Sequence, residues 1–337
     1  MHVERVKAHE LLNENELAVV RARSDLMGRW CVAHAWAVIA GAMALFALWP
    51  NPITFLFGVI VIGSRQLGLA ILMHDGAHGT LAKTPWLNDF LSQWLCAYPV
   101  LTETFTYRKY HLKHHARTQQ KDDPDLELSA PFPITRASFR RKIIRDLTGQ
   151  TAFQQRRSQF RAALGKPEWP WPQRLNLFAR KLGPGLGVNL ALFAVLAALG
   201  VWWVYPLLWV LPFMTWMQVV LRVRNIAEHA IVPDNNDPYR NARTTLANWW
   251  ERAILAPYWV NYHVEHHLLM WVPCYRLPAM HKMLAAKGIT QRMEIRPNYL
   301  NVLKDATARG IDADGGGERR INRAFEGDRP RAGISAL

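Results

Sequence analysis

Long apolar runs constrain this sequence more than any other feature. Four of them are long enough, or nearly so, to cross a bilayer of about 30 Å as helices. Short proline-bearing links, WPNP and GVWWVYP, join them in pairs. The pattern predicts an all-α integral membrane protein with four transmembrane helices in two hairpins. The expected spans are about 31–49, 53–73, 186–205 and 206–222.

The rest of the chain divides around these runs. Two weaker apolar segments, about 86–104 and 246–260, carry charges or prolines and are expected to be interfacial or re-entrant. We expect residues 1–30 to form a cytosolic segment and 31–290 the membrane domain. Residues 291–337 are expected to be a cytosolic tail that becomes disordered after about 310, in the Gly/Arg-rich stretch DADGGGERRINR.

The formal net charge of +15 is unevenly distributed along the chain. Between 105 and 182 basic residues outnumber acidic ones roughly three to one, whereas the two links carry no charge. This asymmetry follows the positive-inside rule and argues against nucleic-acid binding. It predicts a multi-pass protein with both termini and all histidine clusters in the cytosol. A plasma or inner membrane and the endoplasmic reticulum fit equally well.

Nine of the thirteen histidines occur in four short groups. The motifs that hold them are HDGAH, HLKHH, NIAEH and HVEHH. Each group follows an apolar segment, so all should meet at one membrane face. The histidines are His74 and His78; His111, His114 and His115; His229; and His263, His266 and His267.

Offsets of three and four residues place these imidazoles on one face of a helix. Imidazole suits Fe, Zn, Cu or Ni, and the sequence lacks the clustered cysteines that would favour a structural zinc site. Nine imidazoles exceed the four ligands of an ordinary zinc site, so the set fits two metals that each keep room for a further ligand. A cytosolic helical cap that carries the histidine boxes is therefore expected.

The order and spacing of HDGAH, HLKHH and HVEHH, with the apolar hairpins between them, resemble the membrane-bound fatty acid desaturase and hydroxylase superfamily. The stretch DDPDLE after the second box also resembles the corresponding part of members of this superfamily. The resemblance covers roughly residues 30–290 and implies a non-haem di-iron centre that activates O2. It implies that the eight histidines of these three boxes are iron ligands. Through the NxxxH element it implies His229 as a ninth ligand and Asn225 as a water-mediated or outer partner.

Carboxylates beside the boxes offer a second role. Asp75, Glu228 and Glu265 could accept the other ring N–H of a ligand, or point instead to solvent or basic neighbours. Arg65 lies within the second apolar run and could meet a lipid head group or a carboxylate. We favour a position in which it extends to the cytosolic surface.

The basic segment 136–181 could bind anionic head groups or an acidic electron-transfer partner, although a solvated cytosolic face is the simpler interpretation. The sequence has no Gly-rich nucleotide loop and no His-Pro-Gly-Gly haem motif. A separate donor is therefore expected, either a ferredoxin or a cytochrome with its reductase.

The family resemblance predicts O2-dependent desaturation of an acyl chain, with paired electron donors. Hydroxylation or ketolation of a lipid or carotenoid on the same scaffold is the alternative, because substrate placement decides between them. The three residues between the histidines of HDGAH favour acyl-lipid desaturases, hydroxylases or carotenoid ketolases over acyl-CoA desaturases. A metal transporter is a more remote alternative, because transport sites usually lie near the bilayer midplane.

Overall fold

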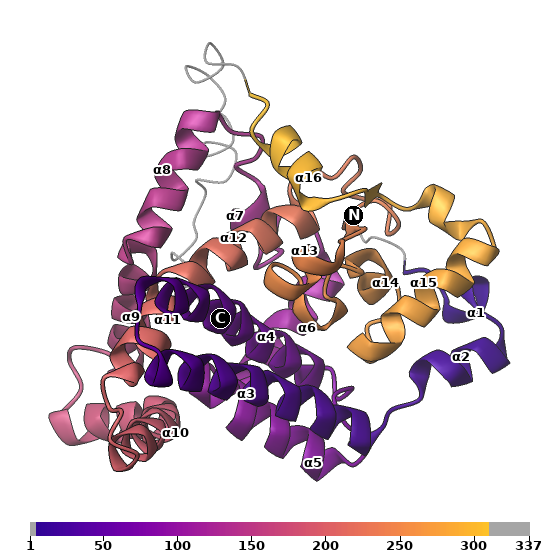
Figure 1. Cartoon of the computed structure of the whole chain (residues 1–337). Helices are drawn as coiled ribbons and strands as arrows, with labels where there is room; N and C mark the ends of the chain where they lie inside the picture. The colour runs from indigo at the N-terminus through magenta and orange to yellow at the C-terminus, as the bar shows by residue number, and fades with distance from the viewer. Residues whose placement is uncertain (1–4, 310–337) are drawn as a thin grey trace.

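A computed structural model describes residues 5–309, which fold mainly into helices (Figure 1). The α-helices are α1 (Ala8–Leu11), α2 (Glu14–Arg21), α3 (Asp25–Leu48), α4 (Pro52–Ala77), α5 (Pro85–Phe90), α6 (Thr104–Arg117), α7 (Leu126–Ser129), α8 (Arg136–Leu147), α9 (Gln150–Ala163), α10 (Trp171–Ala198), α11 (Leu211–Met214), α12 (Trp216–His229), α13 (Trp249–Ile254), α14 (His263–Leu268), α15 (Leu277–Ala286) and α16 (Tyr299–Ala306). The π-helices are η1 (Leu91–Ala97) and η3 (Tyr205–Val210), and the 3-10 helices are η2 (Tyr98–Val100), η4 (Pro257–Trp259), η5 (Cys274–Arg276) and η6 (Ile289–Arg292). Strands β1 (Thr244–Thr245) and β2 (Ile295–Arg296) form one short parallel pair.

Four helical stretches in the described residues are long and apolar enough to cross a membrane. This confirms a mainly helical protein with four candidate spans, although the boundaries differ from the expected ones. The weaker segments 86–104 and 246–260 form only short helices, and their interfacial or re-entrant position stays a prediction. The four candidates are α3, α4, α10 and the stretch Tyr205–His229, which includes η3, α11 and α12.

Capping residues fix where the first two candidate spans begin. The Ser24 hydroxyl accepts the N–H of Met27 at 3.3 Å, so α3 starts before the apolar run itself. Asn51 Oδ1 accepts backbone N–H groups at the start of α4, where Pro52 fits the first helical turn. Hydropathy alone therefore placed the start of α3 too late.

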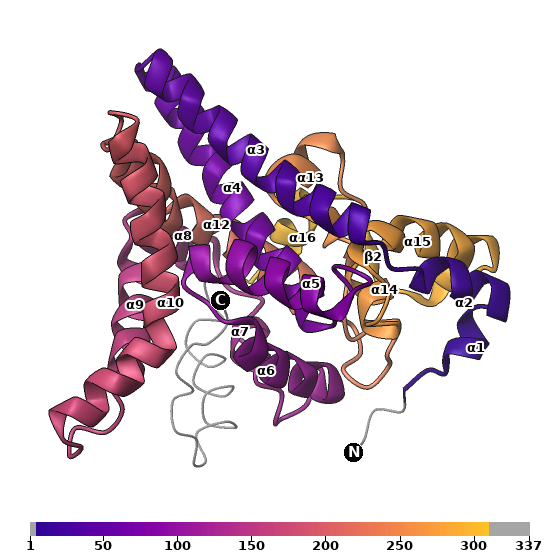
Figure 2. The same cartoon turned by 90° about the horizontal axis from the view of Figure 1, so that it is seen from below.

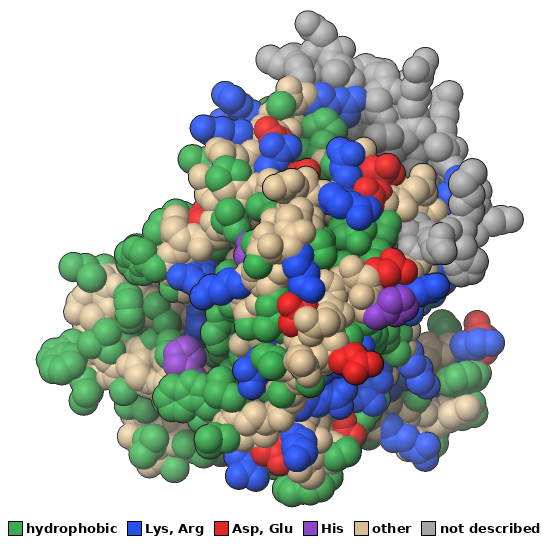
Figure 3. Space-filling model, turned by 90° about the vertical axis from the view of Figure 1, so that its right-hand side faces the viewer, with side chains coloured by type: hydrophobic (Ala, Val, Ile, Leu, Met, Phe, Trp, Pro, Cys, Tyr) green, Lys and Arg blue, Asp and Glu red, His purple; other side chains and the backbone are tan. Residues whose placement is uncertain are grey.

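The four candidates differ in how much protein covers them. In its most apolar window α4 is 67% buried, whereas α10 is only 17% buried. α3 and α4 pack along each other, and α10 lies apart from them beside α9 (Figures 1 and 2). α10 exposes large apolar residues such as Leu190 and Val195, which suits contact with lipid. In Figure 3 apolar side chains likewise gather at the left edge, away from the charged groups at the centre.

The third candidate begins and ends earlier than expected, and the fourth ends later than expected. α10 starts at Trp171, before the expected start at about 186, and continues through Pro184. The fourth candidate is helical as far as His229, with a break at Thr215, whose φ/ψ of −124°/−84° is not helical. The apolar run stops at about 222, but the helix continues into the histidine motif.

Part of the predicted C-terminal tail is folded. α16 packs against α12, and β2 pairs with β1. Tyr299, Val302 and Ala306 are buried, because they form the apolar face of an amphipathic helix. Residues up to 309 therefore pack onto the rest of the fold, beyond the expected domain boundary at 291. The disorder predicted after about 310 lies outside the described residues.

Gly76, between the two histidines of the first box, allows α4 to approach η1 closely. A Cβ on Gly76 would lie 2.1 Å from the Cβ of Ser92, which is too close for any side-chain rotation to relieve. Gly76→Ala is therefore expected to destabilise the fold by about 1–3 kcal/mol. The midpoint of thermal unfolding in detergent measures this loss. Gly41→Ala is the control, because a Cβ there meets nothing within 4 Å; equal midpoints for the two variants would contradict the packing argument.

Candidate metal centre

Four helical elements that are far apart in sequence bring the histidine groups together. α4 carries His74 near its end, and His78 directly follows the helix. α6 carries the HLKHH motif, α12 ends at His229, and α14 begins at His263. Offsets of three and four residues turn the side chains of each helix toward the others.

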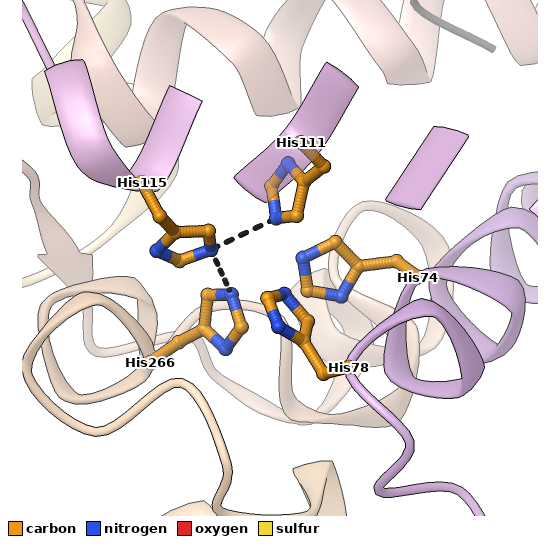
Figure 4. A group of neighbouring side chains, drawn as sticks. All are labelled: His74, His78, His111, His115 and His266. Carbon is orange, nitrogen blue, oxygen red and sulfur yellow. Dashed lines mark hydrogen bonds between the residues drawn. The ribbon is translucent and has the colours of Figure 1, made fainter. Parts of the chain in front are cut away.

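Five of the histidines form a first group, drawn in Figure 4. One ring nitrogen of each lies within 4.8 Å of those of the others. His115 Nε2 is 2.9 Å from His111 Nε2 and 3.0 Å from His266 Nε2. The group consists of His74, His78, His111, His115 and His266.

A second group consists of His114, His229 and His267, and His263 adjoins it. His229 Nε2 lies 3.2 Å from His114 Nε2 and 2.8 Å from His263 Nε2. The rings of His115 and His267 are 4.3 Å apart between centroids, so the two groups are neighbours. The structure thus brings all nine predicted histidines into one double cluster.

Burial keeps most of these imidazoles uncharged. Burial first, then nearby positive charge, lowers the pKa of His78 to about 3. Burial and the neighbouring imidazoles also hold the pKa values of five histidines of α6 and α14 well below the usual range. These are His111, His115, His263, His266 and His267. Neutral imidazole offers a lone pair, which is the form that binds metal.

His114 differs because of its neighbour. Burial lowers the pKa of His114, but the hydrogen bond and charge of Asp123 outweigh that effect and the net shift is upward. The two side chains join through Asp123 Oδ1 and His114 Nδ1 at 2.8 Å. The contact holds Nδ1 outward and leaves Nε2 facing the second group.

Several buried ring nitrogens lack any hydrogen-bond partner within the described part of the chain. They are both nitrogens of His74 and Nε2 of His78. A buried polar atom left without a partner costs stability. A metal ion among the converging lone pairs would remove that cost, so this donor set fits imidazole-binding metals such as iron.

Comparison with known proteins agrees with this geometry. A family model described as "Fatty acid desaturase" matches residues 50–297, a range that contains all four histidine groups. The chain belongs to the fatty acid desaturase family. Members of this family typically hold non-haem iron, and the histidine cluster here is able to bind a metal.

Three relatives cover most of the chain. A dihydrorhizobitoxine desaturase of Bradyrhizobium elkanii is 28% identical over 77% of this chain and 75% of its own length. An sn-1 oleoyl-lipid 12-desaturase of Picosynechococcus sp. is 26% identical over 72% of each chain. A beta-carotene ketolase of Paracoccus sp. is 25% identical over 72% of this chain and 88% of its own.

Polar groups outside the desaturase histidine cluster orient several rings. The backbone carbonyl of Asn241 lies 3.3 Å from His229 Nδ1, and the hydroxyl of Thr118 lies 3.3 Å from His267 Nδ1. The hydroxyl of Tyr107 lies 3.3 Å from His111 Nδ1. Such contacts fix each ring through Nδ1 and leave Nε2 facing the other imidazoles of the cluster. Sequence reasoning missed all three: Tyr107 and Thr118 stand four residues from His111 and His114, a helical offset that could have pointed to them, whereas the Asn241 carbonyl gives no sequence signal.

Glu228 and Asn225 lie beside the second group. Glu228 Oε1 is 3.6 Å from His263 Nδ1, and it accepts a 2.6 Å hydrogen bond from Arg224 Nε. Asn225 lines a small cavity of about 40 Å³ together with His229 and His263. Both residues therefore lie where an outer partner of the ligands is expected.

Asp75 and Glu265 have other contacts. Asp75 Oδ2 accepts the backbone N–H of Cys274 at 2.8 Å, whereas its Oδ1 is 3.9 Å from His74 Nδ1, beyond hydrogen-bond distance. Glu265 accepts the hydroxyl of Thr244 at 2.5 Å and contacts His281 Nδ1. Its position between two ligands on a helix turns it away from the metal face. Glu265 thus anchors α14 to β1 and α15, and the imidazole that it contacts, His281, lies outside the histidine cluster.

Arg65 does not reach the surface. Its side chain is buried, with only 7% of the residue exposed. It donates to the backbone carbonyl of Ala253 and lies 5.7 Å from the ring centroid of Tyr258. This buried position differs from the predicted extension to the cytosolic surface, and the described partners of Arg65 are the Ala253 carbonyl and the Tyr258 ring.

Proposed function

We propose that this chain is a membrane di-iron oxidoreductase that uses O2 to desaturate an acyl chain. The observation that carries the proposal is the double cluster of nine imidazoles. Within the group of five and within the group of three, one ring nitrogen of each residue lies within 4.8 Å of the others, and His263 Nε2 lies 2.8 Å from His229 Nε2. We further propose that the nine histidines are the ligands of two irons. The first group would hold one iron, and His114, His229, His263 and His267 the other.

Two irons with O2 supply an oxidant strong enough to remove hydrogen from an unactivated methylene, which amino-acid side chains cannot do. The protein's own groups hold this centre in place. Asp123 fixes the orientation of His114, and Tyr107 stands beside His111. Burial of the imidazoles excludes water from the reacting region.

Desaturation has a definite electron balance. Substrate and donor each give two electrons, two protons are taken up, and O2 leaves as two waters. The sequence has no Gly-rich nucleotide loop and no His-Pro-Gly-Gly haem motif. We therefore propose that a separate protein supplies the electrons, either a ferredoxin or a cytochrome with its reductase. Paired donors of this kind are part of the proposal.

Desaturation is favoured over the alternatives because two of the three relatives are named desaturases. The relative named a ketolase keeps hydroxylation or ketolation of a lipid or carotenoid as the second candidate. A metal transporter finds no support in these names. The substrate is proposed to be long and apolar, since large apolar surfaces lie on the candidate spans.

The charge asymmetry supports a proposal for topology. We infer two hairpins, α3 with α4 and α10 with Tyr205–His229, and a helical cap on the cytosolic side that carries the histidines. Both termini would lie on that side. The membrane domain is proposed to extend over about 31–290, together with the folded segment up to 309.

The test is expression with a reductase and donor, followed by mass spectrometry of lipids and pigments under ¹⁸O₂. The expected product lacks two hydrogens and carries no ¹⁸O, and it forms only with iron and O2. A product that contains ¹⁸O would favour the hydroxylase or ketolase alternative. Metal uptake without oxidation of any lipid or pigment would overturn the proposal.

A further inference from the structure

A cavity of about 460 Å³ opens between the start of α6, α9 and α10. α10 packs against both α9 and η2, so the cavity walls belong to elements held together (Figure 2). Its apolar lining includes Leu101, Leu182, Ala163 and Gly185. An apolar chain could therefore lie along these residues.

The rim of this cavity is positively charged. Arg156, Arg180 and Lys181 line it, and Glu103 is the acidic residue among its lining groups. Glu103 is engaged as the cap of α6, where its carboxylate oxygens accept the backbone N–H groups of Phe105 and Thr106 at 3.1 and 2.6 Å. The positive charge of the rim therefore exceeds the negative charge.

The cations are placed to act on a ligand. Arg180 Nε donates to the neutral Asn176 side chain at 2.9 Å, a contact that leaves its charge uncompensated. Arg156 is packed over the ring of Phe213, 5.4 Å from its centroid. Burial lowers the pKa of Arg156 only to about 10, so it stays charged at neutral pH. Arg180 and Lys181 belong to the first half of a candidate span, where head groups and basic side chains meet.

Tyr107 connects this cavity to the metal centre. It lines the 460 Å³ cavity and also the 40 Å³ cavity bounded by His111, His114, His229 and His263. Its hydroxyl is 3.3 Å from His111 Nδ1. The side chain of one tyrosine thus forms the wall between the outer cavity and the histidine cluster.

We propose that this cavity binds an anionic amphiphile, with a carboxylate or phosphate head group held by Arg156, Arg180 and Lys181 and the chain directed past Tyr107 to the histidine cluster. The inference rests on the proposed function, in which the cluster oxidises such a chain. It assigns a head-group class to the substrate, which neither the histidines nor the relatives specify.

Direct binding tests the assignment. The full-length protein is placed in phosphatidylcholine nanodiscs and titrated with radiolabelled dodecanoate, dodecyl phosphate and dodecanol, with empty nanodiscs as background. We expect tighter binding of at least one anion than of the alcohol. The combined variant Arg156→Gln, Arg180→Gln, Lys181→Gln should lose roughly tenfold or more in affinity for that anion and none for dodecanol. The stronger of the two anions identifies the head group as carboxylate or phosphate.

Two further variants control for misfolding and for general charge. Arg157 and Arg161 are exposed on the same helix and do not line the cavity, so Arg157→Gln with Arg161→Gln should bind all three ligands like the wild type. Ala162 lines the cavity and is exposed, so Ala162→Trp can fill the cavity without crowding the core and should weaken binding of all three ligands. Equal binding of anion and alcohol, or wild-type affinity in the combined variant, would overturn the inference.

Turnover separates this inference from the proposed function. If the binding pattern holds but no chain is oxidised, the head-group site stands and the reaction assignment fails. If oxidation proceeds with wild-type KM and wild-type affinity in the combined variant, the reaction stands and the head-group site fails.

Discussion

Replacement of His115 by alanine is expected to abolish turnover while the protein stays in the membrane. His115 Nε2 lies within 3.0 Å of ring nitrogens of His111 and His266, and its ring also contacts that of His267. Its loss would remove a ligand at the junction of the two groups. α6 is not one of the four candidate spans, so membrane insertion should continue. Product formation per milligram of membrane-bound protein measures the effect.

His9→Ala is the matched control, because His9 is exposed and lies outside the cluster. It should keep wild-type turnover. His267→Ala should behave like His115→Ala, since His267 Nε2 lies 3.1 Å from His263 Nε2 in the second group. Full activity in either cluster variant would contradict the ligand assignment.

Asp123→Asn is expected to lower iron affinity or turnover by about 10–100-fold. Asp123 is almost fully buried, and its Oδ1 lies 2.8 Å from His114 Nδ1. Burial raises the pKa of Asp123, but the bond to His114 and the backbone N–H groups outweigh it and keep the carboxylate ionised. Asparagine preserves the shape of the Asp123 side chain but removes its negative charge. That charge makes His114 Nε2 a stronger electron-pair donor to a metal. Iron retained after titration with a chelator, measured beside turnover, reports both effects.

The neighbouring residue provides the comparison for Asp123. Asp122 is exposed and forms a surface ion pair with Arg117 at 3.1 Å. Such pairs contribute little, about 0–1 kcal/mol, so Asp122→Asn should leave iron binding unchanged. If the two variants retained equal amounts of iron, Asp123 would have no role in orienting His114.

Hydropathy was enough to predict four candidate spans but not where they begin and end. A helix continues beyond its apolar run wherever caps and tertiary contacts support it. Asp25 illustrates this, since its carboxylate accepts both the N–H and the hydroxyl of Thr84, at 2.8 and 2.7 Å. α10 continues through Pro184, although a proline inside a helix removes one backbone hydrogen bond and crowds the preceding turn. A hydropathy pattern shows neither the Asp25–Thr84 contact nor the continuation of α10 through Pro184.

The histidine cluster could be predicted because its spacing repeats the period of a helix. Two of its outer partners, Asp123 and Asn241, could not, because they come from turns and from other elements. Asp123 follows His114 across a turn, and Asn241 contributes a backbone carbonyl. Glu265 looked equivalent to Glu228 in sequence, yet it contacts Thr244 and His281. Only the tertiary structure distinguishes these two carboxylates.

Metal content of the purified wild-type protein tests the central claim most directly. Each chain should contain two iron ions, with Mössbauer parameters of nitrogen-ligated non-haem iron, because the imidazoles form two adjacent groups. His115→Ala and His267→Ala should each lower that content. A single metal ion per chain, or zinc in place of iron after expression with ample iron, would contradict a di-iron centre held by these nine histidines.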